Sequence, residues 1–303
     1  MLFKGKTGTL ASSRGSLKWA AALVLIGALA CSGNETLVLR VGGIPDQDVT
    51  RLARRYQEFA DYMSARLGVE VEYVPSVDYA AVVTAFTQGG LDLAYFGGLT
   101  GVQARLREPG SMAIAQRERD AKFHSKFIVR VDLPVNSLAD LENHAGGLTL
   151  TFGSESSTSG HLMPRHFLVQ AGVEPDVDFK SLPNFSGSHD LTWRLVESGA
   201  FDVGALNEAV WQRAVDAGRV DLAKVRVFYT TPEYFDYHWT VAGHVDQEFG
   251  DGFSRRIQRA LLELDTQDHA EILQLFNAEQ FIETNNQNYS DIEEIARASG
   301  IIR

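Results

Sequence analysis

Strands and helices alternate along this chain, and that alternation restricts the folds open to it. In the first half, short apolar runs of strand length are each followed by a longer run with the apolar spacing of a helix. The predicted elements are strands 37–41, 69–74 and 91–96, and helices 50–67, 79–87 and one from about 100. Such alternation predicts a parallel sheet with helices on both faces, where ligands bind beyond the carboxyl ends of the strands.

The alternation restarts after residue 127. The predicted elements are helices 138–142, 160–171, 189–198 and 208–217, strands 148–152, 203–206, 225–229 and 239–242, and only helices from 247 onward, among them 253–264 and 292–298. No Pro- or Gly/Ser-rich linker separates the halves, so the chain should cross between them in strands near Phe127 and Trp239. We therefore predict an α/β fold of two lobes around a ligand cleft with a helical C-terminal tail. Lobe I comprises residues 31–126 with 240–303, and lobe II comprises residues 127–239.

The N-terminus carries the pattern of an export signal. Four basic residues and no acidic ones precede an apolar run, 19–30, which is too short to span a bilayer comfortably but suits a signal peptide. The single cysteine, Cys31, follows at once, and the small residues before it resemble a bacterial lipoprotein signal, although Ala28 stands where Leu is usual. We expect residues 1–30 to be removed and Cys31 to anchor the protein by a lipid in the periplasm or cell envelope. The alternative is a plain secretory signal.

The charge balance argues against one class of partner. The chain has 28 basic and 39 acidic residues, a net charge of −11, and four of the basic residues lie in the signal region. The expected mature chain is more acidic still, with 24 basic residues (28 less 4) against 39 acidic ones. Nucleic-acid binding needs a basic footprint, so we expect none. A small anion stays eligible, because a few aimed dipoles outweigh a diffuse surface field at contact distance.

A run of hydroxyl side chains, Ser156-Ser-Thr-Ser159, lies between Gly153 and Gly160, where a predicted strand ends and a helix begins. A helix start exposes unpaired backbone N–H groups and the positive end of the helix dipole. Glycine lets an anion approach the backbone, and hydroxyls donate to it. An ordinary N-cap, the alternative explanation, needs only one such residue. The stretch therefore predicts an oxyanion cradle.

The sequence lacks the familiar patterns of catalysis and metal binding. No Gly-x-Ser-x-Gly elbow surrounds the hydroxyl run, and neither a phosphate-binding loop nor a dinucleotide fingerprint occurs. His189 and His238 could form half of a metal site, but no tight ligand spacing accompanies them, and Cys31 belongs to the export signal. We expect no catalysis, no metal and no cofactor.

Five motifs occur in an order that resembles one protein family: Asp78-Tyr-Ala80, Asp92-Leu-Ala-Tyr-Phe-Gly97, Ser157-Thr-Ser-Gly160, Gly187-Ser-His-Asp190 and Asp202-Val-Gly-Ala-Leu-Asn207. Over about residues 37–301 the chain is similar to the solute-binding proteins of phosphonate and phosphite ABC importers, which are type II periplasmic binding proteins. The longer strings 152–160 and 96–103 resemble a narrower branch labelled as selenate-binding.

The resemblance implies a protein that closes on a tetrahedral oxyanion and passes it to an ABC permease and its ATPase; we expect a monomer. In the family the Ser-Thr-Ser turn holds the anion oxygens, here Ser157, Thr158 and Ser159. The turn histidine and the tyrosine that opens the second helix, here His189 and Tyr79, add donors. The alternatives on this fold are a ligand-sensing module for a signalling receptor and an enzyme.

Other candidate ligand contacts follow from position. The family pattern makes Tyr95 and Phe96 walls of the cleft, but neighbours on a strand point to opposite faces, so only one should touch the ligand. Helix N-termini disfavour a charged imidazole, so His189 should donate a single N–H from its neutral form. Asn207 ends a strand as an amide donor, and Tyr237 lies at the predicted second crossing.

The sequence leaves the identity of the anion open. A monoprotonated phosphorus anion carries an O–H that fully ionised selenate or sulfate lacks. A carboxylate facing the cradle would therefore favour phosphorus, whereas a site of donors alone would favour selenate or sulfate. Glu155 is the carboxylate nearest the cradle in the sequence.

Overall fold

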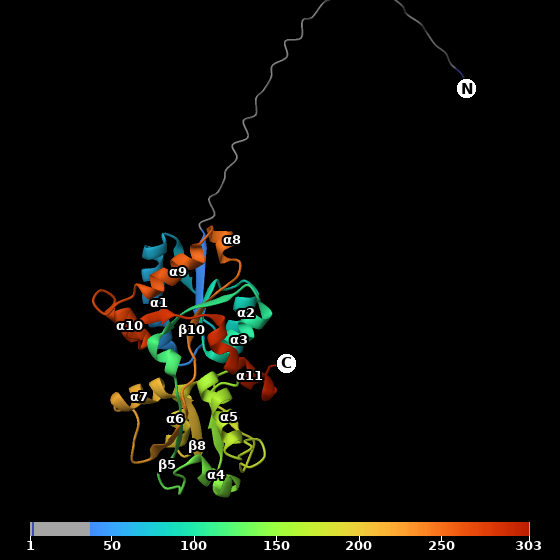
Figure 1. Ribbon diagram of the computed structural model, residues 1–303, viewed down its shortest axis with the longest axis vertical. Helices are drawn as coiled ribbons and strands as arrows, with labels where there is room; N and C mark the ends of the chain where they lie inside the picture. The colour runs from blue at the N-terminus through green and yellow to red at the C-terminus, as the bar shows by residue number, and fades with distance from the viewer. Residues whose placement is uncertain (1, 3–36, 303) are drawn as a thin grey trace, which may run out of the picture. The chain divides into compact units, whose positions relative to one another are not determined.

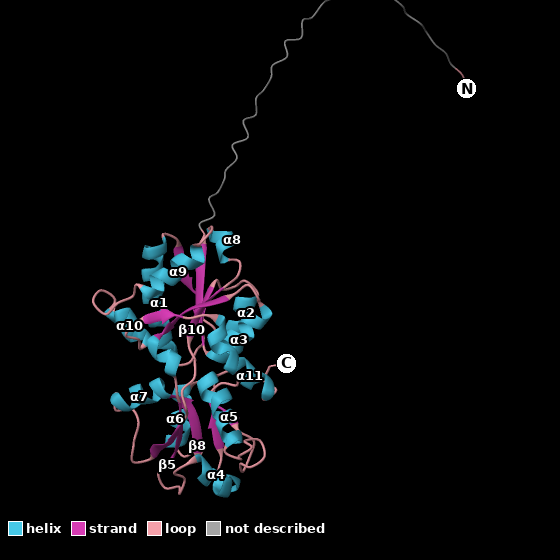
Figure 2. Ribbon diagram, in the orientation of Figure 1, coloured by secondary structure: helices cyan, strands magenta, loops and turns pink. Residues whose placement is uncertain are grey.

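The computed structural model describes Leu2 and residues 37–302. The compact unit from Thr36 to Arg303 contains two β-sheets, each flanked by helices (Figure 1, Figure 2). We call the part built on the first sheet lobe I and the part built on the second sheet lobe II. The predicted signal peptide and Cys31 lie outside the described residues.

Sheet 1 is the centre of lobe I. Its strands are β1 (Val38–Gly43), β2 (Glu70–Tyr73), β3 (Leu93–Phe96), β4 (Met112–Arg117), β10 (His238–Val241) and β11 (Phe281–Glu283). Their order in the sheet is β11-β4-β10-β3-β1-β2. β1 pairs in parallel with β2 and β3, whereas β10 runs antiparallel to β3 and β4, and β11 antiparallel to β4. The carboxyl ends of β1, β2 and β3 thus lie at one edge.

The helices of lobe I start and stop where the sequence supplies caps. They are α1 (Val49–Leu67), α2 (Tyr79–Thr87), α3 (Gly98–Arg107), α8 (Val245–Phe249), α9 (Phe253–Leu262), α10 (Ala270–Phe276) and α11 (Ser290–Ala298), with the 3-10 turns η1 (Glu118–Lys122) and η4 (Asn286–Tyr289). Asp78 accepts the N–H of Ala81 at 2.7 Å, which starts α2 at Tyr79 as predicted. Gly68 ends α1 with a left-handed φ of 73°.

Sheet 2 is the centre of lobe II. Its strands are β5 (Ser125–Arg130), β6 (Leu150–Phe152), β7 (Asn184–Phe185), β8 (Val203–Asn207) and β9 (Val225–Thr230), in the order β7-β6-β8-β5-β9. The helices are α4 (Leu138–His144), α5 (Met163–Gln170), α6 (His189–Glu197) and α7 (Glu208–Asp216), with the short turns η2 (Ala145–Gly147) and η3 (Thr158–Leu162). Along β5, Phe127 and Val129 enter one apolar cluster and Ile128 another, so helices cover both faces of the sheet.

The chain crosses between the lobes in two segments that pair with each other. Phe123 and Tyr234 exchange backbone hydrogen bonds of 2.9 and 3.0 Å in an antiparallel bridge. Sheet membership differs slightly from the predicted lobe boundaries at both crossings. Ser125 and Lys126 belong to β5 of sheet 2, and His238 and Trp239 belong to β10 of sheet 1.

The observed sheets are mixed rather than parallel, because the strand that follows each crossing, β5 in lobe II and β10 in lobe I, runs opposite to its neighbours. β11 is also reversed, since it pairs antiparallel with β4. The prediction of only helices after residue 247 is wrong, since β11 extends the edge of sheet 1. β4 and the two-residue strand β7 were likewise not predicted from the sequence. β7 and β11 have two and three residues, which are too few to show the apolar alternation that identifies a strand.

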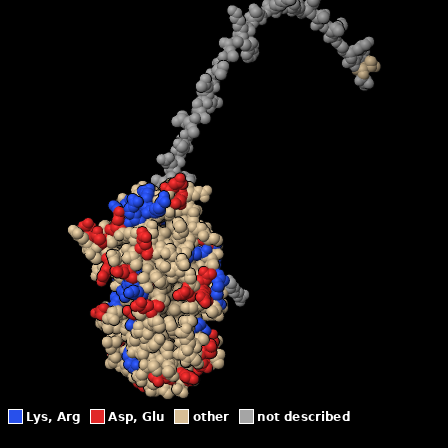
Figure 3. All heavy atoms as spheres, in the orientation of Figure 1, with Lys and Arg blue, Asp and Glu red and all other residues tan. Residues whose placement is uncertain are grey.

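Among the residues that the structure describes, no helix is long and apolar enough to cross a membrane. On the face shown in Figure 3, acidic and basic side chains are interspersed, and one group of basic side chains lies over α9. That face has no continuous basic stripe.

Candidate functional site

The hydroxyl run lies at the junction of the lobes. Ser157 caps η3, a single π-helical turn that leads into α5, and its Oγ accepts the N–H of Gly160 at 2.9 Å. Thr158 Oγ1 accepts the N–H of Leu99, in the first turn of α3 of lobe I, at 2.9 Å. The Ser159 hydroxyl is buried and makes no well-formed hydrogen bond within residues 37–302. Lobe I therefore covers the start of η3 directly.

Two further positions shape this turn. An added Cβ on Gly160 would lie 2.9 Å from Ser157 Oγ, 3.0 Å from His189 Cε1 and 3.1 Å from Gly153 Cα, so only glycine allows this approach. Ser156 is half-buried, and its N–H lies 3.4 Å from Ser154 Oγ. The helical segment predicted to start at Gly160 begins two residues earlier, with the N–H groups of Thr158 and Ser159 at its open end.

Three of the predicted residues form one hydrogen-bonded group. The N–H of Asn207 donates to Nδ1 of His189 at 3.3 Å, so the proton of the neutral ring belongs on Nε2. Tyr237 Oη lies 3.4 Å from His189 Nε2 and accepts Nδ2 of Asn207 at 2.9 Å. Burial lowers the pKa of His189 to about 4, which keeps it neutral at pH 7. The predicted neutral donor form of this histidine matches this geometry.

Tyr79 contributes a phenol from lobe I. It is the first residue of α2, is 1% exposed, and its hydroxyl has no hydrogen-bond partner among the described residues. The hydroxyl lies near Ser157 of the hydroxyl run. Burial raises the pKa of Tyr79 well above its usual value, so the phenol keeps its proton and can donate it to an anion.

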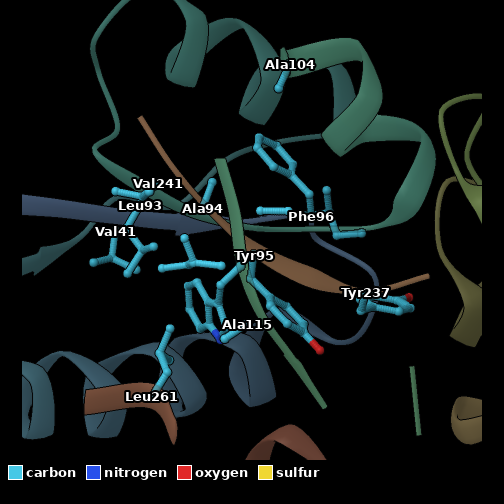
Figure 4. Close-up of a cluster of buried hydrophobic side chains, with 14 of the residues drawn as sticks. Val41, Leu93, Ala94, Tyr95, Phe96, Ala104, Ala115, Tyr237, Val241 and Leu261 are labelled. Carbon is cyan, nitrogen blue, oxygen red and sulfur yellow. The ribbon is translucent and has the colours of Figure 1, made fainter. Parts of the chain in front are cut away.

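Tyr95 and Phe96 point to opposite sides of β3, as their adjacency predicts (Figure 4). The Phe96 ring packs edge-on against Phe86 of α2, at 5.3 Å between centroids. The Tyr95 ring packs against Tyr237 at 5.5 Å, and its hydroxyl lies 3.4 Å from Asp120 Oδ2. The structure therefore places Phe96 in the core of lobe I. Tyr95 is likewise buried, and its ring also packs against Trp239 and Phe276.

The carboxylate at the hydroxyl run is Asp236, which the sequence analysis did not single out. Its Oδ1 accepts the N–H of Gly98 at 2.9 Å, and its Oδ2 has no partner in the described part of the chain. The hydroxyls of Thr158 and Ser159 lie next to it, and burial raises its pKa to about 7. Its signal in the sequence was a lone acidic residue between two aromatic ones, Phe235 and Tyr237.

Glu155, the carboxylate nearest the hydroxyl run in the sequence, is exposed. Nδ1 of His161 lies 2.7 Å from the backbone carbonyl oxygen of Glu155, but the Glu155 side chain does not enter the junction. The direction of this carboxylate, which the sequence leaves open, is thus toward solvent.

One group of side chains in the described residues has the composition of a metal site: Asp92, His244 and Glu248. His244 Nε2 lies 2.9 Å from Asp92 Oδ1 and 3.8 Å from Glu248 Oε2. The other oxygen of Asp92 accepts the N–H of Arg40 at 2.6 Å. Hydrogen bonds within lobe I thus occupy both oxygens of Asp92, at the start of β3 and away from the hydroxyl run.

The sequence profile described as "ABC transporter, phosphonate, periplasmic substrate-binding protein" matches residues 41–289. The chain belongs to this family. It is 46% identical over 270 residues to the probable ABC transporter phosphite binding protein PhnD1 of Prochlorococcus marinus, covering 88% of this chain and 91% of the relative. The solved structure of PhnD1 with methylphosphonate superposes with a TM-score of 0.83, covering 88% of this chain and 99% of that one.

Two more distant proteins extend the comparison. The phosphate-import protein PhnD of Mycolicibacterium smegmatis is 30% identical over 222 residues, which cover 66% of this chain and 67% of the relative. A binding-protein component of a phosphonate ABC transporter from Pseudomonas aeruginosa has a TM-score of 0.76 at 19% identity, covering 86% of each chain, and supports the fold alone.

The family, the type II binding-protein fold and the role as an oxyanion-binding component of an ABC importer are thus confirmed. Binding components of this family are periplasmic and work with a permease and an ATPase. The selenate label and the lipid anchor stay predictions.

Proposed function

We propose that the chain captures a protonated phosphorus oxyanion, of the phosphite or methylphosphonate class, and delivers it to an ABC permease. The observation that carries this proposal is Asp236 Oδ2, a buried carboxylate oxygen that has no well-formed hydrogen bond to any described residue and lies beside the hydroxyls of Thr158 and Ser159. Buried polar atoms nearly always have a partner, so such an atom at the end of a helix marks a place where a ligand donates.

The surrounding groups complete the polar complement of a tetrahedral anion. The hydroxyls of Tyr79 and Ser159, which have no well-formed hydrogen bond to a described residue, and the first N–H groups of η3 would donate to its charged oxygens. The Nε2–H of His189, which lies 3.4 Å from Tyr237 Oη, would be a further donor to the anion. Asp236 would accept the remaining acidic O–H. The names of the relatives PhnD1 and the phosphate-import protein support phosphorus anions.

Asp236 also provides the discrimination against selenate and sulfate. An ionised carboxylate repels an anion unless a proton lies between them. A monoprotonated phosphorus anion brings that proton, whereas fully ionised selenate can accept a hydrogen bond there only when Asp236 itself is protonated. The proposal therefore favours the broader phosphorus class over the selenate branch.

Calorimetric titration of the chain that starts after Cys31 tests this proposal. We expect methylphosphonate and phosphite to bind at pH 7 much more tightly than selenate and sulfate. In Asp236→Asn this preference should shrink or reverse, because the amide can donate to an anion that lacks a proton. Glu155→Gln removes an exposed carboxylate nearby and should change nothing. Tight selenate binding by the wild type that survives Asp236→Asn would show that the ligand assignment is wrong.

The same proposal extends to the role and place of the protein. The chain would bind its ligand without chemical conversion, as a monomer, after export and lipid anchoring at Cys31. Recovery of methylphosphonate unchanged after prolonged incubation, and a single monomer mass in light scattering, check the first two points. Loss of membrane association in Cys31→Ser checks the anchor.

A further inference from the structure

A second set of contacts joins the lobes outside the hydroxyl run, through the loop that follows β1. Gln47, in this loop, is only 8% exposed. Its Oε1 accepts a hydrogen bond from Nη2 of Arg213, which lies on α7 of lobe II. Its amide nitrogen donates to Asp46 Oδ2 at 3.1 Å. A single side chain of lobe I thus connects a buried carboxylate to an arginine of the other lobe.

Asp46 anchors this connection in lobe I. Its carboxylate lies 3.6 Å from Nη1 of Arg55 in α1, and Arg55 Nε donates to the carbonyl of Leu275 at 3.1 Å. The carbonyl of Asp46 accepts the N–H of His189, the first residue of α6, at 3.3 Å. Arg55 and Asp46 are each 2% exposed. Contacts within lobe I therefore fix Asp46, and Asp46 in turn fixes the Gln47 side chain that accepts from Arg213.

The Arg213 guanidinium donates a hydrogen bond to Gln47 but is not paired with an acidic side chain in the described residues. Within residues 37–302 no carboxylate lies within 4.0 Å of its guanidinium. Burial lowers its pKa to about 10. Its hydrogen bond to Gln47 exists only while the lobes are together, because the two residues belong to different lobes. When the lobes separate, water replaces it.

We propose that the hydrogen bond between Gln47 and Arg213 is a latch: it slows opening of the closed protein and so increases the residence time of the bound anion. The latch rests on the function proposed above. An anion enclosed between the lobes can leave only after they open, so a contact made only in the closed form slows dissociation. Association starts from the open form, where the contact is absent, and should hardly change.

The test is the dissociation rate of methylphosphonate, measured by stopped-flow competition for wild type, Arg213→Ala, Gln47→Ala and the double variant. Each single variant should raise koff about tenfold, the size of one hydrogen bond to a charged group, with kon unchanged within about twofold. The double variant should be no faster than the singles, because all three break the same contact. Thermal unfolding of each variant verifies that it is folded.

Arg194→Ala is the matched control. It removes the same charge from lobe II, where the Arg194 guanidinium lies over the ring of Trp193 at 5.3 Å. Its koff should equal that of the wild type. Unchanged koff in Arg213→Ala, additive effects in the double variant, or an equal effect of Arg194→Ala would each overturn the latch.

A failure of the proposed function gives a different result. If the wild type binds no phosphorus anion but binds selenate or sulfate, that function is refuted and the same dissociation rates are measured with the anion that binds. A rise in koff of about tenfold for Arg213→Ala then supports the latch, and an unchanged koff refutes it.

Discussion

Replacing Thr158 by valine tests the contact that closes lobe I over the hydroxyl run. Valine keeps the shape of the side chain but removes Oγ1, which accepts the N–H of Leu99 at 2.9 Å. Leu99 is the second residue of α3, so its N–H has no partner within that helix. Both residues are at most 2% exposed, so in the closed form the N–H would be left buried and unpaired.

The size of the effect follows from that loss. An unpaired buried donor costs about 1–3 kcal/mol. In the open form water reaches the N–H, so the cost falls on the closed, ligand-bound form alone. Calorimetric titration with methylphosphonate should therefore show an affinity loss of roughly five- to 150-fold.

Two controls separate this effect from general damage. Thr158→Ser keeps the hydroxyl and should retain most of the affinity. Thr151→Val removes another buried hydroxyl, which accepts Nδ2 of Asn184 at 2.9 Å within lobe II. It should lower the temperature of thermal unfolding without changing affinity. If Thr158→Val binds like the wild type, or if Thr151→Val weakens binding equally, the cross-lobe contact does not govern closure.

Three further predictions concern the same junction. Gly160→Ala should weaken methylphosphonate binding by roughly five- to 150-fold, because ~1–3 kcal/mol of overpacking falls on the turn that holds the anion, whereas Gly147→Ala, where an added Cβ meets nothing within 4 Å, should not. Burial raises the pKa of Asp236 from 3.8 to about 7, so this carboxyl lowers the stability of the unliganded protein progressively as pH rises through that interval. Asp236→Asn should therefore raise the thermal midpoint at pH 8 and bring little gain at pH 4; an equal gain at both would contradict this. Burial lowers the pKa of His189 from 6.5 to about 4, so the free energy of unfolding falls as pH drops through that range. In His189→Gln, the free energy of unfolding measured by denaturant titration should fall less over the same range.

The helices were the most predictable part of the fold. Asp78 and its neighbours specify the start of α2 through a local cap, and the buried stripe of Tyr56, Phe59 and Met63 specifies α1. These signals act within a few residues, so sequence alone reveals them. The family motifs were equally local, which is why the hydroxyl turn and the histidine turn were found.

The strands and the crossings were less predictable. β11 pairs with β4 although the two are far apart in the chain, and β10 reverses direction because it arrives from lobe II. No local period records such pairings. The same reason explains the displaced lobe boundaries, since the pairing of Phe123 with Tyr234 decides where the chain crosses.

The sequence by itself determined the two-lobed α/β architecture, the family and the chemistry of the hydroxyl turn, because caps, apolar periods and motifs are written in neighbouring residues. Only the tertiary structure decided which carboxylate faces that turn. Asp236 reaches it from the second crossing, while Glu155 beside it in the chain points to solvent. It also decided that Tyr95 packs against Tyr237 and that Gln47 is hydrogen-bonded to Arg213. These relations join residues of different elements, and packing between elements, which no local pattern encodes, sets them.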